Sequence, residues 1–487
     1  MSEDLLGSGV WQGKAWSSGW KVLQGGILDV EEPATGQTIG RVSRANAADV
    51  RAACAAARNA QKAWVAMGHA ARAAIFRKAA ALLEANREAF AAWIVRETGG
   101  IPPKAMFEID SVQHHLFEAA AMLTQPQGLV LPSEGGCTSI ARRVPHGVVG
   151  VISPFNFPFL LSSRAVAPAL AAGNAVVLKP DPRTPVSGGV LLAVLLEAAG
   201  LPPGVFHMLP GDAEAGEALV SDPAVAMISF TGSTAVGRRV GELAGRQLKK
   251  VALELGGKNA LIILDDADLE LAVSGGSWAS WLHQGQICMS AGRHLVHRDL
   301  AQVYAHRMAA KAAALPVGDP HTAPVAIGPL ITGRQAERVD RIVQESVRMG
   351  AKLLAGGRCD GRFYHPTVLA EVTPQMPAFR EEIFGPVVSI TAFGSDVEAV
   401  ALAADNEYGL AAGIYTADVG RGMAIAEQLE VGLVHINDQT VNDNGLMPMG
   451  GRGASGNGSR HGGPANWDEF TQWQWLTVRN TAPTYPL

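Results

Sequence analysis

VVGVI at residues 148–152 and AVVLK at residues 175–179 are two short apolar runs that decide the fold class of this chain. Segments with helical composition, such as GGVLLAVLLEAAG and DAEAGEALV, separate most of the runs of this kind. Strands that alternate with helices predict a parallel sheet that is covered on both faces and binds ligands at the carboxyl ends of its strands. The further runs lie at 204–209, 227–230, 250–255 and 260–264.

The residues on both sides continue this α/β pattern. Alanine-rich segments with helical spacing precede the apolar runs, at residues 46–67 and 70–98. A second α/β series follows, from about residue 256 to about residue 435, with a long helical segment at 334–349 and a strand-like run, VVSITAF, at 387–393. A chain of 487 residues is too long for one small core, so two or three domains are expected.

Two further runs alternate like edge strands. They are SIARRV at 139–144 and QWQWLTV at 472–478. Strands of this kind fit an arm that pairs with another subunit, and they fit an ordinary hairpin within the chain about equally well.

The composition excludes several classes of function. The chain is 48% hydrophobic and 17% charged, with a net charge of −5, so it lacks the basic excess that nucleic-acid binding requires. The N-terminal MSEDLLGSGVW carries acidic residues where a secretory signal has basic ones. The most apolar stretch, at 165–178, contains Pro168, Gly173 and Asn174 and is shorter than the roughly 20 residues of a membrane span. We therefore expect a cytoplasmic protein with no membrane or nucleic-acid partner.

One of the four cysteines stands apart from the others. No CxxC pair or metal-type spacing is present, so neither a disulfide framework nor a metal site is predicted. A free cysteine usually fills space as a small apolar residue, and Cys54 fits that interpretation. Cys288, in GQICMSAGR (285–293), lies instead among small and polar residues between Gly285 and Gly292, which is more typical of a nucleophile.

Polar residues follow several of the predicted strands. Asn156 comes just after the first run, where its amide can donate to an oxyanion or simply form a turn. Glu254 ends an apolar strand, where a raised pKa would suit a general base, although an exposed or ion-paired acid is the more common case. Lys179 either binds a ribose or phosphate or is a solvated charge. Gly232 and Ser233, in ISFTGSTAVG, precede a helix-like segment whose first amides suit a phosphate, a weak signal by itself.

Taken in order, these runs resemble the aldehyde dehydrogenase superfamily over essentially the whole chain. The matching runs are PFNFP, LKP, FTGS, LELGGK, GQIC, EEIFGP (381–386) and PMGGRGASG (448–456). Within the superfamily, RRVPHGVVGVISPFNFP, WLHQGQICMSAGRH and HGGPANWDEFTQWQW look most like bacterial benzaldehyde dehydrogenases, with vanillin dehydrogenases as close relatives. Such enzymes serve the breakdown of aromatic compounds.

The resemblance implies an α/β architecture and an oligomer. It combines a Rossmann-type cofactor domain, an α/β catalytic domain and a β-strand oligomerisation arm, assembled as a homodimer or homotetramer. The implied boundaries are 1–122 with 146–256 for the NAD(P)-binding domain, 257–453 for the catalytic domain, and 123–145 with 454–487 for the arm and C-terminal tail.

The resemblance also implies a reaction. Cys288 would attack an aromatic aldehyde to give a thiohemiacetal, whose oxyanion the Asn156 amide and the Cys288 backbone N–H would hold. Oxidation by NAD(P) would leave a thioester, and Glu254 would activate the water that releases the carboxylic acid. The alternatives are a vanillin or other substituted-benzaldehyde dehydrogenase, an aliphatic or semialdehyde dehydrogenase, an esterase that uses Cys288 without redox chemistry, and a non-catalytic homologue.

The same likeness implies the cofactor contacts. Lys179 is expected at the adenosine ribose, and Gly232 and Ser233 are expected near the pyrophosphate. Glu382 and Phe384 are expected to hold the ribose on the nicotinamide side and to pack near the ring.

One position departs from many NAD-preferring relatives. Pro182, followed by Arg183, stands where those relatives have a glutamate that binds the adenosine ribose. No carboxylate at this position repels a 2′-phosphate, so NAD is expected as the cofactor with NADP also accepted.

The substrate pocket should be apolar and wide enough for an aromatic ring. Arg164 falls where an apolar channel residue is frequent, and it would meet either a polar ring substituent or a neighbouring acid. By composition alone, each of the apolar candidates fits a plain core residue better than a pocket residue. They are Phe157, Leu161, Leu282, Ile287, Met289 and Met449.

Overall fold

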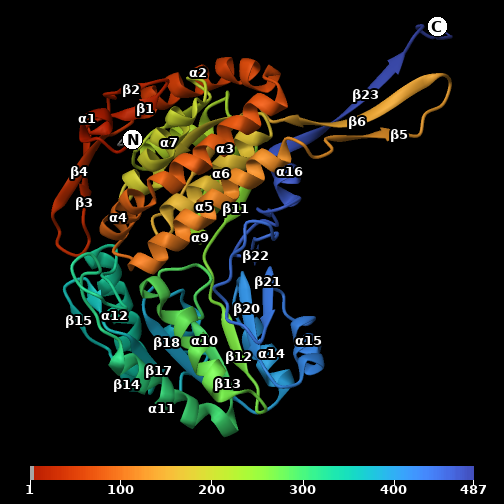
Figure 1. The fold of residues 1–487 in the computed structure, drawn as a ribbon. Helices are drawn as coiled ribbons and strands as arrows, with labels where there is room; N and C mark the ends of the chain where they lie inside the picture. The colour runs from red at the N-terminus through yellow and green to blue at the C-terminus, as the bar shows by residue number, and fades with distance from the viewer. Residues whose placement is uncertain (1–4, 487) are drawn as a thin grey trace.

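Two seven-stranded sheets, one above the other in Figure 1, organise the chain, and a three-stranded arm extends away from them. The structure, a computed structural model, describes residues 5–486. The α/β class that the alternating runs predict is confirmed. Within residues 5–486, no helix combines the length and the apolar content that crossing a membrane requires.

The upper sheet has the strand order β11-β10-β7-β8-β9-β1-β2. Its strands run parallel from β11 to β9, and β1 and β2 add an antiparallel edge. The five apolar runs between residues 148 and 255 form the parallel part. The strands are β1 (Ala15–Ser17), β2 (Trp20–Lys21), β7 (Val148–Ile152), β8 (Ala175–Lys179), β9 (Phe206–Met208), β10 (Met227–Thr231) and β11 (Lys250–Glu254).

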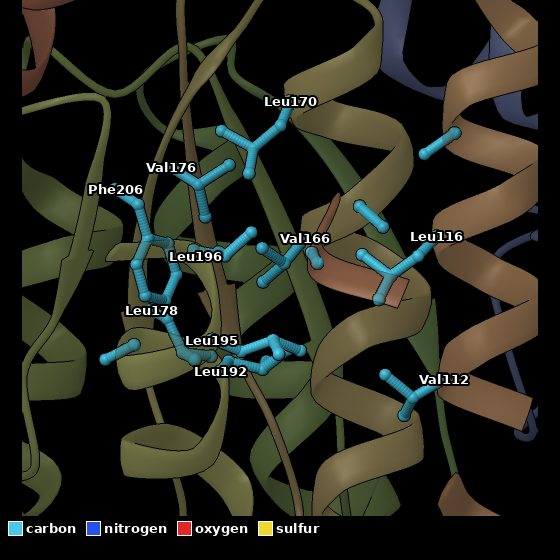
Figure 2. Packing of buried hydrophobic residues seen from close by; sticks show 14 of the residues in the cluster. Val112, Leu116, Val166, Leu170, Val176, Leu178, Leu192, Leu195, Leu196 and Phe206 are labelled. Carbon is cyan, nitrogen blue, oxygen red and sulfur yellow. The ribbon is translucent and has the colours of Figure 1, made fainter. Parts of the chain in front are cut away.

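Helices cover both faces of this sheet because successive side chains of a strand point to opposite faces. In β8, Val176 and Leu178 join one apolar core with α3, α5, α6 and α7, as Figure 2 shows. Ala175 and Val177 join a second core with α2, α8 and α9. The helices are α2 (Ala47–Ala66), α3 (His69–Ala85), α5 (Pro102–Met122), α6 (Pro158–Ala171), α7 (Leu191–Ala199), α8 (Ala213–Ser221) and α9 (Thr234–Gly245), and a π-helical turn, η1 (Val186–Val190), precedes α7.

The helical segment expected at residues 70–98 consists of two helices, α3 and α4 (Arg87–Thr98). Asn86 separates them with φ −120° and ψ 13°, and its side-chain amide donates to the Leu82 carbonyl at 2.9 Å. Asparagine interrupts helices in this way because its side chain competes for backbone hydrogen bonds.

The lower sheet has the order β14-β17-β18-β13-β12-β20-β21 and contains the last apolar run as β12. One face packs on α10 and α11, and the other packs on α12 to α15. The elements are β12 (Ala260–Ile263), α10 (Leu269–Trp281), β13 (Arg293–His297), α11 (Arg298–Ala314), α12 (Gly333–Arg348), β14 (Lys352–Ala355), β17 (Thr367–Ala370), α13 (Pro377–Arg380), β18 (Val387–Phe393), α14 (Asp396–Ala404), β20 (Ala411–Tyr415), α15 (Val419–Ala426) and β21 (Leu433–Ile436).

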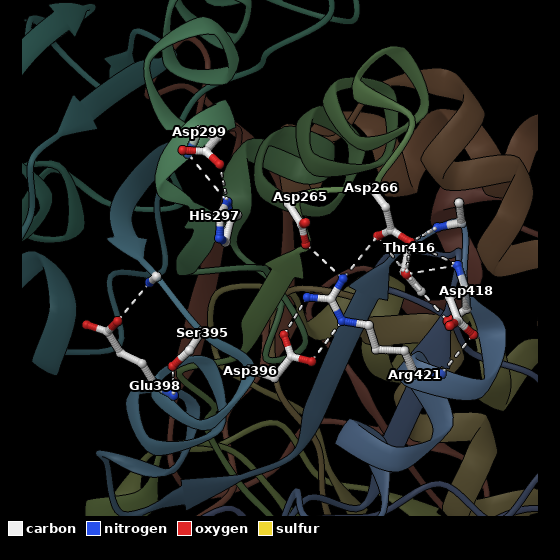
Figure 3. A network of polar contacts seen from close by, with 12 residues as sticks. Asp265, Asp266, His297, Asp299, Ser395, Asp396, Glu398, Thr416, Asp418 and Arg421 are labelled. Carbon is white, nitrogen blue, oxygen red and sulfur yellow. Dashed lines mark hydrogen bonds and ion pairs between the residues drawn. The ribbon is translucent and has the colours of Figure 1, made fainter.

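A polar network ties together the carboxyl ends of the lower-sheet strands (Figure 3). Arg421 of α15 pairs with Asp265, beyond β12, at 2.8 Å and with Asp396, at the start of α14, at 2.5 Å. Asp266 accepts from the Thr416 hydroxyl, just after β20, at 2.8 Å. The network therefore fixes this end of the sheet, and the opposite end carries the candidate site.

The arm consists of β5 (Gly128–Leu131), β6 (Cys137–Pro145) and β23 (Thr471–Arg479). Both predicted edge strands are present, and they pair with each other within the chain, from Thr471 opposite Pro145 to Arg479 opposite Cys137. The pair reaches away from the two sheets in Figure 1 and leaves Trp473 and Trp475 exposed by 52% and 74%. The remaining elements are α1 (Ser8–Trp11), β3 (Ile27–Glu31), β4 (Thr38–Ser43), η2 (Leu282–Gly285), β15 (Cys359–Asp360), β16 (Phe363–Tyr364), β19 (Tyr408–Gly409), β22 (Arg452–Gly453) and α16 (Ala465–Phe470).

Candidate active site

The carboxyl ends of the upper-sheet strands bring four polar positions to one edge. Asn156 follows β7, Lys179 ends β8, Gly232 follows β10 and Glu254 ends β11. All four line one cavity of about 570 Å³. The cavity therefore lies at the edge where open parallel sheets bind ligands.

Cys288 reaches the same cavity from the lower half of the chain, from a short loop between α10 and β13. The loop begins in η2, where His283 and Gln284 take left-handed conformations, with φ 47° and φ 58°. Asn259 holds it in place, because its side-chain amide donates to the Cys288 and Ser290 carbonyls, both at 2.8 Å.

The glycine before Cys288 is required by close packing. Gly285 has φ 66°, and a Cβ there would lie 2.2 Å from the Gly385 carbonyl oxygen. Because only glycine tolerates both conditions, a larger residue would displace the loop that carries the thiol.

Cys288 lies where two cavities meet. It lines the cavity at the edge of the upper sheet, and it also lines a second, largely apolar cavity of about 290 Å³. Asn156 and Leu161 line both as well. One sulfur atom is therefore accessible to a ligand on either side.

Burial sets the protonation of the two candidate catalytic groups. It raises the pKa of the Cys288 thiol to about 12, and Arg164, the cation that lowers this pKa, does not offset the effect. Burial also raises the pKa of Glu254 to about 8, against the opposing charges of Arg164 and Arg460. The chain alone therefore keeps the thiol neutral and leaves Glu254 poised to exchange a proton near neutral pH.

The Glu254 carboxylate is enclosed by a late segment of the chain. Gly456 forms a β-bridge with Glu254, and a Cβ on Gly450 would lie 2.8 Å from a Glu254 oxygen. Among the described residues, neither Glu254 oxygen has a well-aligned hydrogen-bond donor, although the nearby Gly451 amide favours the charged form. Both oxygens are thus buried without a donor among the described residues.

The first cavity fits a dinucleotide. The buried Lys179 ammonium donates to the Pro180 carbonyl at 3.2 Å and lines the cavity, and Ser233 caps α9, whose first amides suit a pyrophosphate. A Cβ on Gly232 would lie 2.6 Å from the Phe230 ring, so the turn requires glycine to hold this shape.

At the other end of this cavity, Glu382 and Phe384 line the wall. Glu382 accepts from the Gly257 N–H at 2.9 Å, and Phe384, with φ 55°, contacts Phe155 edge to face. Gln335 and Arg338 hold this loop through its backbone carbonyls. Gln335 and Arg338 are not predicted from the sequence, because the segment that forms α12 shows helical spacing but no motif of a binding site.

The structure adds a carboxylate near the position that departs from NAD-preferring relatives. Pro182 lies between Asp181 and Arg183, which both line the cavity. Asp181 accepts from the Arg183 guanidinium at 2.8 and 2.6 Å, and that guanidinium also lies 4.1 Å from the centre of the Phe155 ring. The negative charge of Asp181, two residues after Lys179, is therefore balanced by the positive charge of Arg183.

The second cavity holds the six apolar positions expected for the substrate, together with Arg164. Among the residues sequence reasoning missed are Phe107 and Trp278, on helices that show only packing periodicity, and Asp443, on a segment without helix or strand. Residues 5–486 contain no group of three or more His, Cys, Asp or Glu side chains placed to hold a metal ion.

Comparison with known proteins assigns the family. The model of the aldehyde dehydrogenase family matches residues 20–476. The chain belongs to the aldehyde dehydrogenase family. It is 53% identical over 477 residues to a vanillin dehydrogenase from an Amycolatopsis species and 51% identical over 478 residues to benzaldehyde dehydrogenase [NAD(+)] from Pseudomonas putida, each comparison covering 98% of both chains.

Solved structures of this family share the fold. PnpE from a Pseudomonas species, in complex with nicotinamide adenine dinucleotide, superposes with a TM-score of 0.94 at 35% identity, over 98% of this chain and 99% of that one. An NADP-dependent enzyme from E. coli also gives a TM-score of 0.94, at 34% identity over 97% and 99% of the two chains. The predicted aldehyde dehydrogenase fold is confirmed.

Proposed function

We propose that this aldehyde dehydrogenase oxidises aromatic aldehydes of the benzaldehyde type to carboxylic acids, with NAD as its cofactor and NADP also accepted. The observation that carries the proposal is the position of Cys288, which lines both an apolar cavity and the cavity at the edge of the upper sheet. Vanillin and other substituted benzaldehydes are the nearest alternative substrates, because a relative at 53% identity is a vanillin dehydrogenase.

In this mechanism Cys288 is the nucleophile. Its thiol releases its proton to solvent as the sulfur bonds to the aldehyde carbon, and the electron pair of the carbonyl π bond moves to the oxygen, which becomes an oxyanion. Lys179, Gly232, Ser233, Glu382 and Phe384 would hold the dinucleotide, which would supply the hydride acceptor for oxidation of the thiohemiacetal to a thioester. The small residues around Cys288 leave room for both partners.

Asn156 holds the oxyanion with its side-chain amide, together with the Cys288 backbone N–H. The amide is already oriented, because one of its N–H groups donates to the Gln286 carbonyl at 2.9 Å and Asn156 lines both cavities. Donors fixed in place before the charge develops stabilise the transition state without reorganisation.

Glu254 completes the cycle as the general base. Its carboxylate takes a proton from water, the resulting hydroxide attacks the thioester carbon, and the thiolate leaves as the carboxylic acid forms. A base with a pKa of about 8 is well matched to this step near neutral pH.

Replacing Asn156 with alanine should lower kcat by about 100- to 1,000-fold while changing the aldehyde KM little, because the oxyanion exists only after attack. Asn156→Asp should lose at least as much, since it keeps the size but replaces the donor with an acceptor. Steady-state kinetics on benzaldehyde measure both. A kcat for Asn156→Ala within about threefold of the parent would remove Asn156 from this role.

A panel of aldehydes with both cofactors tests the function itself. Benzaldehyde and its ring-substituted forms should give higher kcat/KM than short aliphatic aldehydes, measured by the absorbance of reduced nicotinamide. Turnover with NADP should be readily measurable, because Arg183 and Asp181 balance each other beside the adenosine end. Faster oxidation of aliphatic aldehydes would contradict the aromatic assignment, and a preference for NAD of many hundredfold would contradict the use of NADP.

We propose that residues 1–122 with 146–256 act as the cofactor domain and residues 257–453 as the catalytic domain, which is supported by the separate upper and lower sheets. Residues 123–145 and 454–487 form the arm and tail of a homodimer or homotetramer, supported by the exposed Trp473 and Trp475. The protein works in the cytoplasm on a small-molecule substrate.

A further inference from the structure

Arg164 places a buried cation in the wall of the apolar cavity. It belongs to α6, is 8% exposed, and lines the same cavity as Cys288. A guanidinium carries its charge at every physiological pH, and a buried charge needs a counter-charge or a strong hydrogen-bonding partner.

Asp443 is that counter-charge. Its carboxylate forms an ion pair with Arg164, and the two side chains are 10% and 8% exposed. The other contact of the guanidinium is the Met449 thioether at 3.1 Å, which is a weak acceptor. Asp443 lies on the segment between β21 and β22, so the pair joins a loop to a helix across the cavity wall.

The other titratable groups near Arg164 do not replace Asp443. His115 and His461 face it, but burial lowers the pKa of each to about 3, so both are neutral. Glu254 also attracts Arg164, yet with a pKa of about 8 it is mostly protonated at neutral pH. Asp443 is therefore the carboxylate that the structure places in ion-pair contact with Arg164.

An unpaired arginine in such a cavity would bind a carboxylate through two parallel hydrogen bonds. The Asp443 carboxylate accepts from one guanidinium nitrogen of Arg164, and the Met449 thioether accepts from another. The carboxylate also adds a negative charge that repels a second carboxylate. Discrimination between ligands often depends on a repulsive element of this kind.

We propose that Asp443 is a specificity-determining residue that excludes aldehydes bearing a carboxylate, by occupying the guanidinium of Arg164. The inference rests on the proposed function in one respect, since it takes the apolar cavity as the one that receives the aldehyde. The cavity then selects neutral aldehydes because both cations in its wall are already paired, Arg164 with Asp443 and Lys104 with Glu108. Its apolar residues contribute affinity.

The test is the ratio of kcat/KM for 4-carboxybenzaldehyde to that for 4-methylbenzaldehyde. In the parent enzyme this ratio should be about 0.1 or lower, and Asp443→Asn should raise it by roughly 10- to 100-fold, mainly through KM, as expected for a charge-assisted pair. The double variant Arg164→Met, Asp443→Asn should lose that gain. Asp299→Asn removes an exposed carboxylate on α11 and should leave the ratio unchanged.

A ratio that does not rise in Asp443→Asn, while the variant still oxidises 4-methylbenzaldehyde, overturns the inference. If Asp443→Asn does not fold, the kcat/KM ratio of the parent enzyme is the test, because a parent ratio near one also overturns the inference. Butanal and 4-oxobutanoate form a second neutral and carboxylated pair. A parent that oxidises butanal but neither aromatic aldehyde refutes the proposed aromatic function, and the aliphatic ratio then decides the role of Asp443 separately.

Discussion

Replacing Cys288 with alanine is expected to abolish aldehyde-dependent reduction of NAD while leaving cofactor binding intact. Without sulfur no thiohemiacetal forms, and loss of a covalent nucleophile costs about four orders of magnitude or more in kcat. The dinucleotide should still bind, because Lys179, the Gly232 turn and Glu382 line their cavity independently of the thiol. Steady-state kinetics and equilibrium titration with NAD measure the two effects separately.

Cys359→Ala is the matched control for this prediction. Cys359 lies in the short strand β15 and lines neither cavity. Its replacement tests whether the loss of activity is specific to Cys288 or follows the loss of any cysteine. It should keep the parent rate. Measurable turnover of Cys288→Ala above a few per cent of the parent would mean that another group attacks the aldehyde.

Glu254→Gln is expected to separate the two halves of the reaction. Oxidation should still occur once per site, giving a burst of about one reduced cofactor per subunit, because attack by Cys288 does not use the water that Glu254 activates. Hydrolysis of the thioester should then limit turnover by about 100- to 10,000-fold, the range of general-base catalysis. Rapid-mixing absorbance measures the burst, and mass spectrometry measures the acylated enzyme.

The pH dependence of the parent gives a second measurement of Glu254. Its pKa is raised to about 8, so the carboxyl is protonated and inactive as a base below that pH and active above it. Turnover of the parent should therefore rise as pH increases through about 8. The Glu254→Gln variant should lose this rise, and Glu217→Gln, an exposed acid on α8, should retain it. If Glu254→Gln cycled at the parent rate, another group would be the base.

Much of the fold follows from the spacing of apolar residues along the sequence and from composition. The parallel strands of the upper sheet are predicted because their runs are apolar on both faces, and residues such as Val176 and Val177 do point into two different cores. Asn86 shows where that reasoning loses precision. Its effect depends on one side-chain hydrogen bond to Leu82, and alanine-rich periodicity on both sides conceals it.

The candidate site is predictable to the extent that its residues carry their own signal. Cys288 and Glu254 stand out by chemistry and neighbours, and the order of the motifs identifies the family. Asp181 and Asp443 carry no such signal, because each affects the site through an ion pair with an arginine. Asp181 pairs with Arg183, and Asp443 pairs with Arg164. Trp278 is similar, since helical spacing does not reveal that an exposed side chain lines a cavity.

The β-bridge between Glu254 and Gly456 has a consequence for how the enzyme is made. Ser455 also accepts from the Leu255 N–H at 2.9 Å and donates to the Gly256 carbonyl at 2.6 Å, so the proposed base, Glu254, is enclosed by residues that the ribosome adds about 200 positions later. A nascent chain that has completed the upper sheet therefore displays an open, inactive half-site. The surroundings of Glu254 are therefore complete only when translation is almost finished.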